Sequence, residues 1–90
     1  MEFKEEAQRI VIFDEGNEIG EITWIFDDAG DLVVEHTRVD GTYRGQGLAG
    51  KLVEKVAEYA RREEKKIVPV CSYAKKEFER KSDYADVWKK

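Results

Sequence analysis

Midway through the chain, the period at which apolar residues recur changes from about two residues to about 3.6 residues. This change restricts the possible folds more than any other feature of the sequence. From Ala49 to Ala60, apolar residues recur at i, i+3, i+4, i+7, i+8 and i+11, with charged residues between them. This stripe predicts one long amphipathic helix at about residues 46–64. Such a helix needs an apolar surface to cover, so the remaining residues must supply a sheet or further helices.

The residues before this helix have the alternation and turn chemistry of β-strands. Strands are predicted at Arg9–Phe13, Ile19–Phe26 and Leu32–Val39, with short turns rich in Gly, Asn and Asp between them. A fourth strand is predicted at 67–72 and a short helix at 74–81. The order βββαβα describes one α/β (α+β) domain: a mostly antiparallel sheet, one long helix packed on it and a short C-terminal helix.

Composition narrows the class of protein. The length of 90 residues leaves room for one domain only. The formal net charge of -4 argues against non-specific nucleic-acid binding. Its single cysteine, Cys71, allows no internal disulfide and no cysteine-rich zinc site, and no metal is expected. Without a signal peptide or a membrane-spanning run, we expect a cytoplasmic protein, monomeric or weakly dimeric, that does not bind membranes.

A glycine-rich loop joins the third strand to the long helix. Three glycines lie within Asp40–Gly47. Glycine permits positive φ and a close approach to the backbone, and the helix that follows begins with free N–H groups. These features predict a pyrophosphate site, to which Arg44 adds a charge-assisted contact. No Gly-Lys pair is followed by Ser or Thr, so this is no Walker loop, and the antiparallel strands disfavour a dinucleotide-binding fold. The alternative is a connection that binds nothing.

At this junction the chain resembles the GCN5-related N-acetyltransferases (GNATs). Their signature, Q/R-x-x-G-x-G/A, maps onto Arg44, Gly47 and Ala49. A longer resemblance to a small branch of that superfamily comprises His36-Thr37-x-Val39, Pro69-x-Cys71-x-Tyr73 and Tyr84-x-Asp86-Val87. It implies a minimal GNAT fold and acetyl-CoA as the cofactor. The residues that it implies for binding are Val39, Arg44, Gly45, Gln46, Gly47, Leu48 and Ala49.

Three residues are candidates for the chemistry of acetyl transfer. Cys71 could accept the acetyl group as a thiolate or line the acceptor site, although lone cysteines are often small buried apolar residues. His36 is the candidate base, and Glu35, on the opposite face of the strand, competes with it. By resemblance, Tyr73 or Tyr84 is the candidate general acid for the leaving CoA thiolate.

Pro69 is expected to affect cofactor binding and not to take part in acetyl transfer. Proline cannot donate to a strand ladder, so the sheet is expected to be unpaired near this residue. The resemblance implies that two strands splay apart at this point and admit the pantetheine arm of CoA.

Three functions remain open from the sequence. The first is an acetyl-CoA-dependent N-acetyltransferase acting on an amine of a small molecule or protein, and the second is a CoA-binding regulatory module without turnover. The third is a structural domain that has lost the ligand. Larger superfamily members insert two helices after their first strand, where this chain has only short turns, so a partner chain or a flat protein surface is expected to complete any acceptor site.

Overall fold

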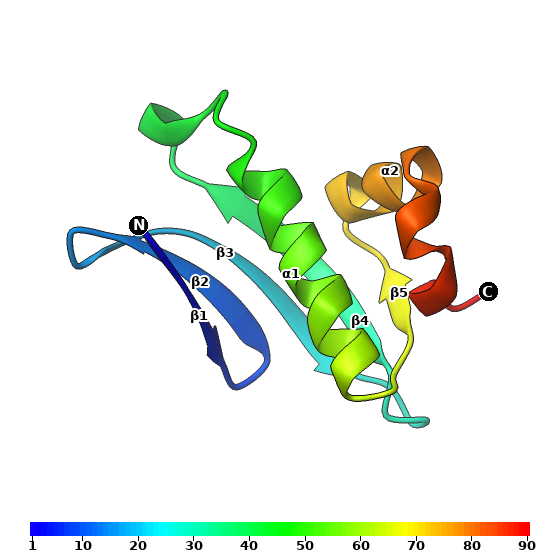
Figure 1. Ribbon diagram of the computed structural model, residues 1–90. Helices are drawn as coiled ribbons and strands as arrows, with labels where there is room; N and C mark the ends of the chain where they lie inside the picture. The colour runs from blue at the N-terminus through cyan, green and yellow to red at the C-terminus, as the bar shows by residue number, and fades with distance from the viewer.

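The computed structural model describes residues 1–90 and consists of a five-stranded sheet with helices on one side (Figure 1). The strands are β1 (Glu2–Glu6), β2 (Arg9–Asp14), β3 (Asn17–Phe26), β4 (Leu32–Val39) and β5 (Ile67–Pro69). The helices are η1 (Gly41–Tyr43), α1 (Leu48–Arg62), α2 (Ser72–Arg80) and η2 (Ser82–Val87), of which η1 and η2 are 3₁₀ helices. The strands lie in sequence order, antiparallel from β1 to β4, whereas β5 runs parallel to β4.

The three predicted strands before the glycine loop are confirmed as β2, β3 and β4, but β1 was not predicted. Its sequence, Glu2-Phe3-Lys4-Glu5-Glu6, carries a single apolar residue that packs against the core. An edge strand buries little surface, so it needs no regular apolar alternation, and its charges discourage pairing with another chain. For this reason periodicity alone misses it.

The predicted boundaries after the loop are wrong by one to three residues: α1 ends at Arg62 rather than at residue 64, and α2 spans Ser72–Arg80 rather than 74–81. α1 begins at Leu48 rather than at residue 46, because Gly45 and Gly47 adopt positive φ angles of 84° and 73° that an α-helix does not contain. The fourth predicted strand ends at Pro69 rather than at residue 72, and the chain turns directly into α2.

The core lies between the sheet and α1. Every buried residue of α1 belongs to the stripe or directly precedes it: Leu48, Leu52, Val53, Val56, Ala57 and Ala60. They pack against the inner faces of β2, β3 and β4, where Trp24 stacks on Tyr59 of α1 with ring centroids 5.1 Å apart. The C-terminal segment extends the same core beside β5 through Phe78, Tyr84 and Val87.

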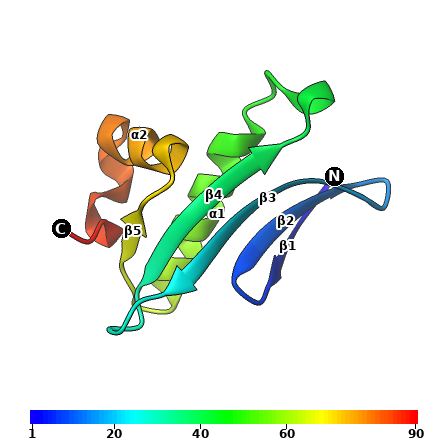
Figure 2. The ribbon, with the colours of Figure 1, turned by 180° about the vertical axis from the view of Figure 1, so that it is seen from behind.

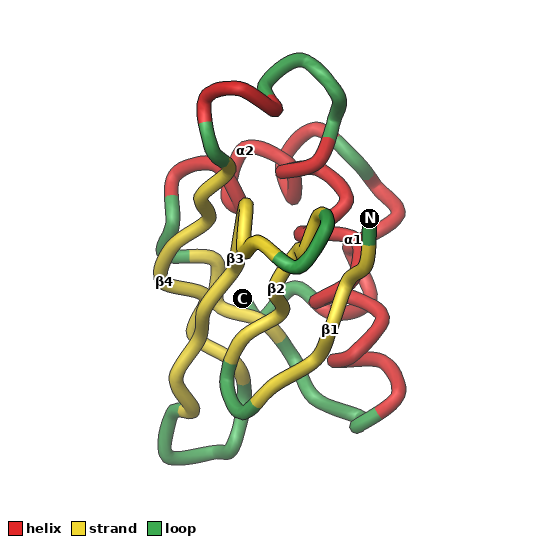
Figure 3. The backbone as a smooth tube through the Cα atoms, turned by 90° about the vertical axis from the view of Figure 1, so that its left-hand side faces the viewer, coloured by secondary structure: helices red, strands yellow, loops and turns green.

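The opposite face of the sheet is not covered by a helix. Seen from behind, β4 passes in front of α1 and β3 and β2 follow beside it (Figure 2), and the side view shows strands and helices as two layers (Figure 3). Because the helices cover one face of the sheet only, the fold presents two distinct regions, an open sheet face and a helical side that carries the glycine loop.

None of the helices has the length and apolar character that crossing a bilayer requires.

Candidate functional site

The glycine loop forms an uncapped helix N-terminus. Gly47 is the N-cap of α1, and no side chain bonds to the first N–H groups of the helix. These groups lack intrahelical partners and carry the positive end of the helix dipole. A Cβ atom added to Gly45 or Gly47 would meet no protein atom within 4 Å. The backbone here is therefore open to a ligand, as the sequence predicts.

A hollow of about 320 Å³ lies at this loop. It is lined by Val39, Tyr43, Arg44, Gly45, Gly47, Leu48, Ala49 and Tyr73. The structure thus brings together all predicted cofactor-binding residues except Gln46, which is exposed outside the hollow. The sequence analysis missed Tyr43, whose hydroxyl donates to Asp14 Oδ2 at 2.6 Å and ties the loop to β2. That hydrogen bond raises the pKa of Tyr43, so the phenol stays protonated.

The sheet opens next to this hollow, between β4 and β5. The β4–β5 ladder ends at the pair Val34 and Pro69, and the N–H groups of Val70 and Cys71 both donate to the Val34 carbonyl, at 3.1 and 3.0 Å. From residue 35 to residue 39, β4 has β3 on one side and no strand on the other. The local loss of pairing expected at Pro69 is confirmed.

Cys71 lies at this opening, at the N-cap of α2. Its Sγ contacts the Thr37 hydroxyl of β4 at 3.5 Å. Burial opposes ionisation of the thiol, but the backbone N–H groups of Ala74 and Tyr73 and the Thr37 hydroxyl outweigh it, so the pKa of Cys71 lies below its ordinary value. The side chain is a half-buried free thiol rather than a core residue.

The two candidate tyrosines have different surroundings. Tyr73 lines the loop hollow and its hydroxyl lies over the first turn of α1, 3.5 Å from where a Cβ of Gly50 would be. Burial, followed by the negative charge of Glu77, raises the pKa of Tyr73, which keeps the phenol in its proton-donating form. Tyr84 is buried in the core against Phe78, with ring centroids 5.2 Å apart. Only Tyr73 therefore faces the hollow.

His36 lies on the opposite, open face of the sheet. It precedes Thr37 on β4, so the side chains of these neighbours point to opposite faces, and the ring of His36 is 54% exposed. Its Nε2 lies 3.4 Å from Glu21 Oε2 of β3. The structure thus places Tyr73 at the hollow, Cys71 beside Thr37 at the edge of β4, and His36 on the other face of β4. Glu35, the competing base, is exposed and lies at a β-bulge, where it has no partner on β3.

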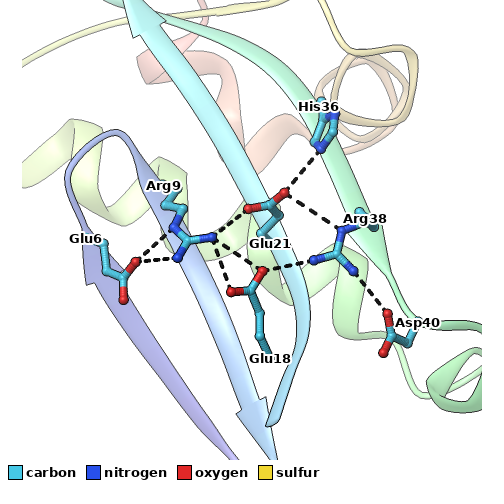
Figure 4. Close-up of polar contacts among 7 residues, drawn as sticks. All are labelled: Glu6, Arg9, Glu18, Glu21, His36, Arg38 and Asp40. Carbon is cyan, nitrogen blue, oxygen red and sulfur yellow. Dashed lines mark hydrogen bonds and ion pairs between the residues drawn. The ribbon is translucent and has the colours of Figure 1, made fainter.

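Glu21 is the centre of a charged network on the open face (Figure 4). Arg9 Nη1 contacts its Oε1 at 2.9 Å, and Arg38 Nε lies 3.8 Å from Oε2. Burial works to raise the pKa of Glu21, but hydrogen bonds from Arg9 and His36 and the charge of Arg38 outweigh it, so the pKa lies below its ordinary value. Glu21 is therefore an anion beside His36. Sequence analysis missed this pair because the partners lie on different strands.

Comparison with known proteins identifies the fold and the family. A family profile described as GCN5-related N-acetyl-transferase matches residues 9–87. The chain belongs to this family. The GNAT signature is the loop that forms the hollow, and the resemblance found in the sequence is confirmed.

Solved structures agree with this membership. A GCN5-like N-acetyltransferase candidate from Staphylococcus aureus, solved by NMR, has a TM-score of 0.80 and 37% identity, over 98% of this chain and 87% of that chain. A GNAT-family protein from S. aureus subsp. aureus matches with a TM-score of 0.61 and 22% identity, over 69% of this chain and 53% of its own. A streptothricin acetyltransferase candidate from Bacillus anthracis, in complex with acetyl coenzyme A, matches with a TM-score of 0.57 and 20% identity, over 66% and 34%. These last two show the fold alone. No curated protein sequence matches the chain significantly.

The lowered pKa of Cys71 predicts that this thiol reacts with iodoacetamide at a lower pH than a free cysteine does. The thiolate is the reacting form, so the alkylation rate should reach its plateau at a lower pH than that of a free cysteine, and at pH 7 Cys71 should react several-fold faster than in the Thr37→Val variant. Intact-mass kinetics from pH 5 to 10 measure both curves. A Cys71 profile that coincides with that of free cysteine would contradict this account of the thiol.

Proposed function

We propose that the protein is an N-acetyltransferase that takes its acetyl group from acetyl-CoA and transfers it to an amine. The proposal depends mainly on one observation: the positive-φ glycines, the uncapped start of α1 and the unpaired edge of β4 lie next to one another. In acetyl-CoA a pyrophosphate is followed by an extended arm with two amides. The pyrophosphate needs backbone N–H groups and a cation, and the arm needs the free N–H and C=O groups of a strand edge.

The cofactor fits along this region in one direction. The pyrophosphate would be held by the N–H groups of α1 and by Arg44, which lines the hollow. The pantetheine arm would follow Val39 and the free edge of β4. Its thioester would then lie near Cys71, beside Thr37.

The residues present can support acetyl transfer by two routes. In the direct route the amine loses a proton to His36, attacks the thioester carbonyl, and expels CoA as a thiolate that Tyr73 protonates. In the covalent route the Cys71 thiolate attacks first, forming S-acetyl-Cys71 and expelling CoA as a thiolate that Tyr73 protonates. The amine then attacks S-acetyl-Cys71, takes the acetyl group, loses its proton to solvent and expels the Cys71 thiolate. The lowered pKa of Cys71 favours the covalent route. In the direct route, the position of His36 beside Glu21 requires the amine to approach from the open face of the sheet.

The surface around these residues favours an acceptor that is itself large. None of the five hollows of the molecule is lined by Cys71 or His36. A small amine has no enclosed pocket to bind in, whereas a lysine side chain or N-terminus on a protein surface can reach an open sheet face. The same observation supports a second candidate, a CoA-binding regulatory module without turnover.

Ligand-induced stabilisation and intact mass separate these candidates. Acetyl-CoA at about 100 times its Kd should stabilise the fold by about 2.7 kcal/mol, a melting-temperature rise of roughly 11–22 °C for a chain of this size. After incubation with acetyl-CoA, wild-type protein should gain one acetyl group that Cys71→Ala does not acquire. Absence of stabilisation would refute both candidates, and equal acetylation of the two proteins would refute the covalent route.

Turnover is tested with a lysine-containing peptide library and a thiol reagent that detects free CoA. Peptide-dependent CoA release should occur with wild-type protein and fall in His36→Gln. Stabilisation by acetyl-CoA without CoA release from any peptide would support the regulatory module instead.

A further inference from the structure

The carboxylate of Glu21 lies beside the ring of His36 on the open face of the sheet (Figure 4). In the β3–β4 ladder Glu21 is paired with Arg38, and Thr23 is paired with His36. Residues two apart on a strand share a face, so Glu21 reaches His36 along the diagonal of the ladder. The separation of 3.4 Å joins Glu21 Oε2 to Nε2, the ring nitrogen further from the backbone. Strand register therefore decides which of the two ring nitrogens faces the carboxylate.

Two arginines hold the carboxylate of Glu21 in place. Its Oε1 accepts a hydrogen bond from Arg9 Nη1 at 2.9 Å, and Arg38 Nε lies 3.8 Å from Oε2. With Oε1 bonded to Arg9, Oε2 is the oxygen that faces His36. A carboxylate beside two cations stays ionised, and an ionised carboxylate can only accept hydrogen bonds. Nε2 of His36 must therefore carry a proton in order to bond to it.

A proton on Nε2 leaves the lone pair of a neutral histidine ring on Nδ1. Nδ1 of His36 has no hydrogen-bond partner in the protein, and the shape of the ring turns it away from Glu21. The side chain of His36 is 54% exposed, whereas that of Glu21 is 17% exposed. The basic atom of the pair is thus open to an incoming amine, and the carboxylate behind it is largely covered.

We propose that Glu21 is a positioning residue, which holds neutral His36 in the Nε2–H tautomer and so makes Nδ1 the atom that takes the proton of the acceptor. The inference rests on the proposed function, in which His36 is the base of the direct route. The ammonium group of the acceptor gives a proton to Nδ1 and keeps the electron pair that attacks the thioester. The imidazolium that forms lies against the Glu21 carboxylate, which stabilises its charge, and then returns the Nδ1 proton to solvent.

NMR tests the tautomer without any turnover, because His36 is the only histidine of the chain. At about pH 9, where a histidine ring is neutral, the ¹⁵N shifts of wild-type protein should show a protonated Nε2 and an unprotonated Nδ1. Glu21→Gln should show a mixture of both tautomers, because an amide donates as well as accepts. A wild-type ring protonated on Nδ1, or the same tautomer ratio in both proteins, would overturn the inference.

Kinetics with a lysine peptide test the consequence for acetyl transfer. Glu21→Gln should lower kcat about tenfold or more, a part of the roughly 10²–10⁴-fold that a positioned base contributes. The KM for acetyl-CoA should stay unchanged, because Glu21 lies on the open face and does not line the hollow at the glycine loop. An unchanged kcat in this variant would refute the positioning role.

Glu18→Gln is the matched control. Glu18 lies on the same strand and contacts the same two arginines, Arg9 Nη1 at 3.3 Å and Arg38 Nη2 at 3.0 Å, but it makes no contact with His36. This variant removes the same charge and should keep the wild-type tautomer and kcat. If it lowers kcat as much as Glu21→Gln does, the effect belongs to the charge of the network and the inference fails while the proposed function stands. Wild-type protein that acetylates no peptide would refute the proposed function, and the role of Glu21 with it.

Discussion

Replacing Trp24 with alanine should destabilise the protein more than any other single truncation we consider, by about 3–5 kcal/mol. Trp24 is 2% exposed and stacks on Tyr59, so its removal leaves a cavity between β3 and α1. The total stability expected for a domain of 90 residues is about 5–13 kcal/mol. The variant should therefore unfold at much lower urea concentrations than wild type, or fail to fold at 37 °C.

Trp24→Phe is the informative comparison, because the indole N–H of Trp24 is buried without a hydrogen-bond partner. Phenylalanine keeps the stacking partner for Tyr59 and removes that donor, so its cost should be well below that of alanine. Urea unfolding followed by circular dichroism measures both. A loss below about 1 kcal/mol for Trp24→Ala would contradict the packing of this core.

Replacing Gly47 with alanine should weaken acetyl-CoA binding by at least tenfold while costing only about 1 kcal/mol of stability. The stability cost comes from the positive φ of 73°, which a Cβ disfavours. The binding loss has another cause: the Cβ occupies the space where the pyrophosphate must approach the first N–H groups of α1. Calorimetry with acetyl-CoA and urea unfolding measure the two effects separately.

Gly16→Ala controls for strain. Gly16 has a φ of 82°, and a Cβ there also meets no protein atom within 4 Å, but it lies in the β2–β3 turn. It should show a similar stability cost and wild-type binding. If Gly16→Ala weakens binding as much as Gly47→Ala does, the loss reflects general destabilisation and not the loop.

The features that could be predicted from the sequence are those determined by neighbouring residues. The apolar stripe of α1 predicts both the helix and the face that it buries, because every contact along it repeats within one or two turns. The glycine loop is equally local, since Gly45 and Gly47 adopt their positive φ angles at the start of that helix. The family resemblance rests on the same residues.

The features that could not be predicted depend on contacts between distant segments. Tyr43 reaches Asp14 across 29 positions, and Cys71 reaches Thr37 across 34. Glu77 pairs locally with Arg80, but its burial depends on α1, because its Oε1 lies 3.5 Å from where a Cβ of Gly50 would be. No periodicity encodes which of two remote side chains will meet.

The sequence by itself determined strands β2 to β5, helices α1 and α2, their order and the glycine loop, because a turn of helix or a positive-φ glycine depends on its immediate neighbours. Only the tertiary structure decided which candidate residues lie together. Sheet pairing ends β5 at Pro69 and opens the edge of β4, and the alternation of that strand directs Thr37 toward Cys71 and His36 toward the open face. Strand register and side-chain burial are properties of the assembled sheet, so the separation of His36 from Cys71 follows from the fold alone.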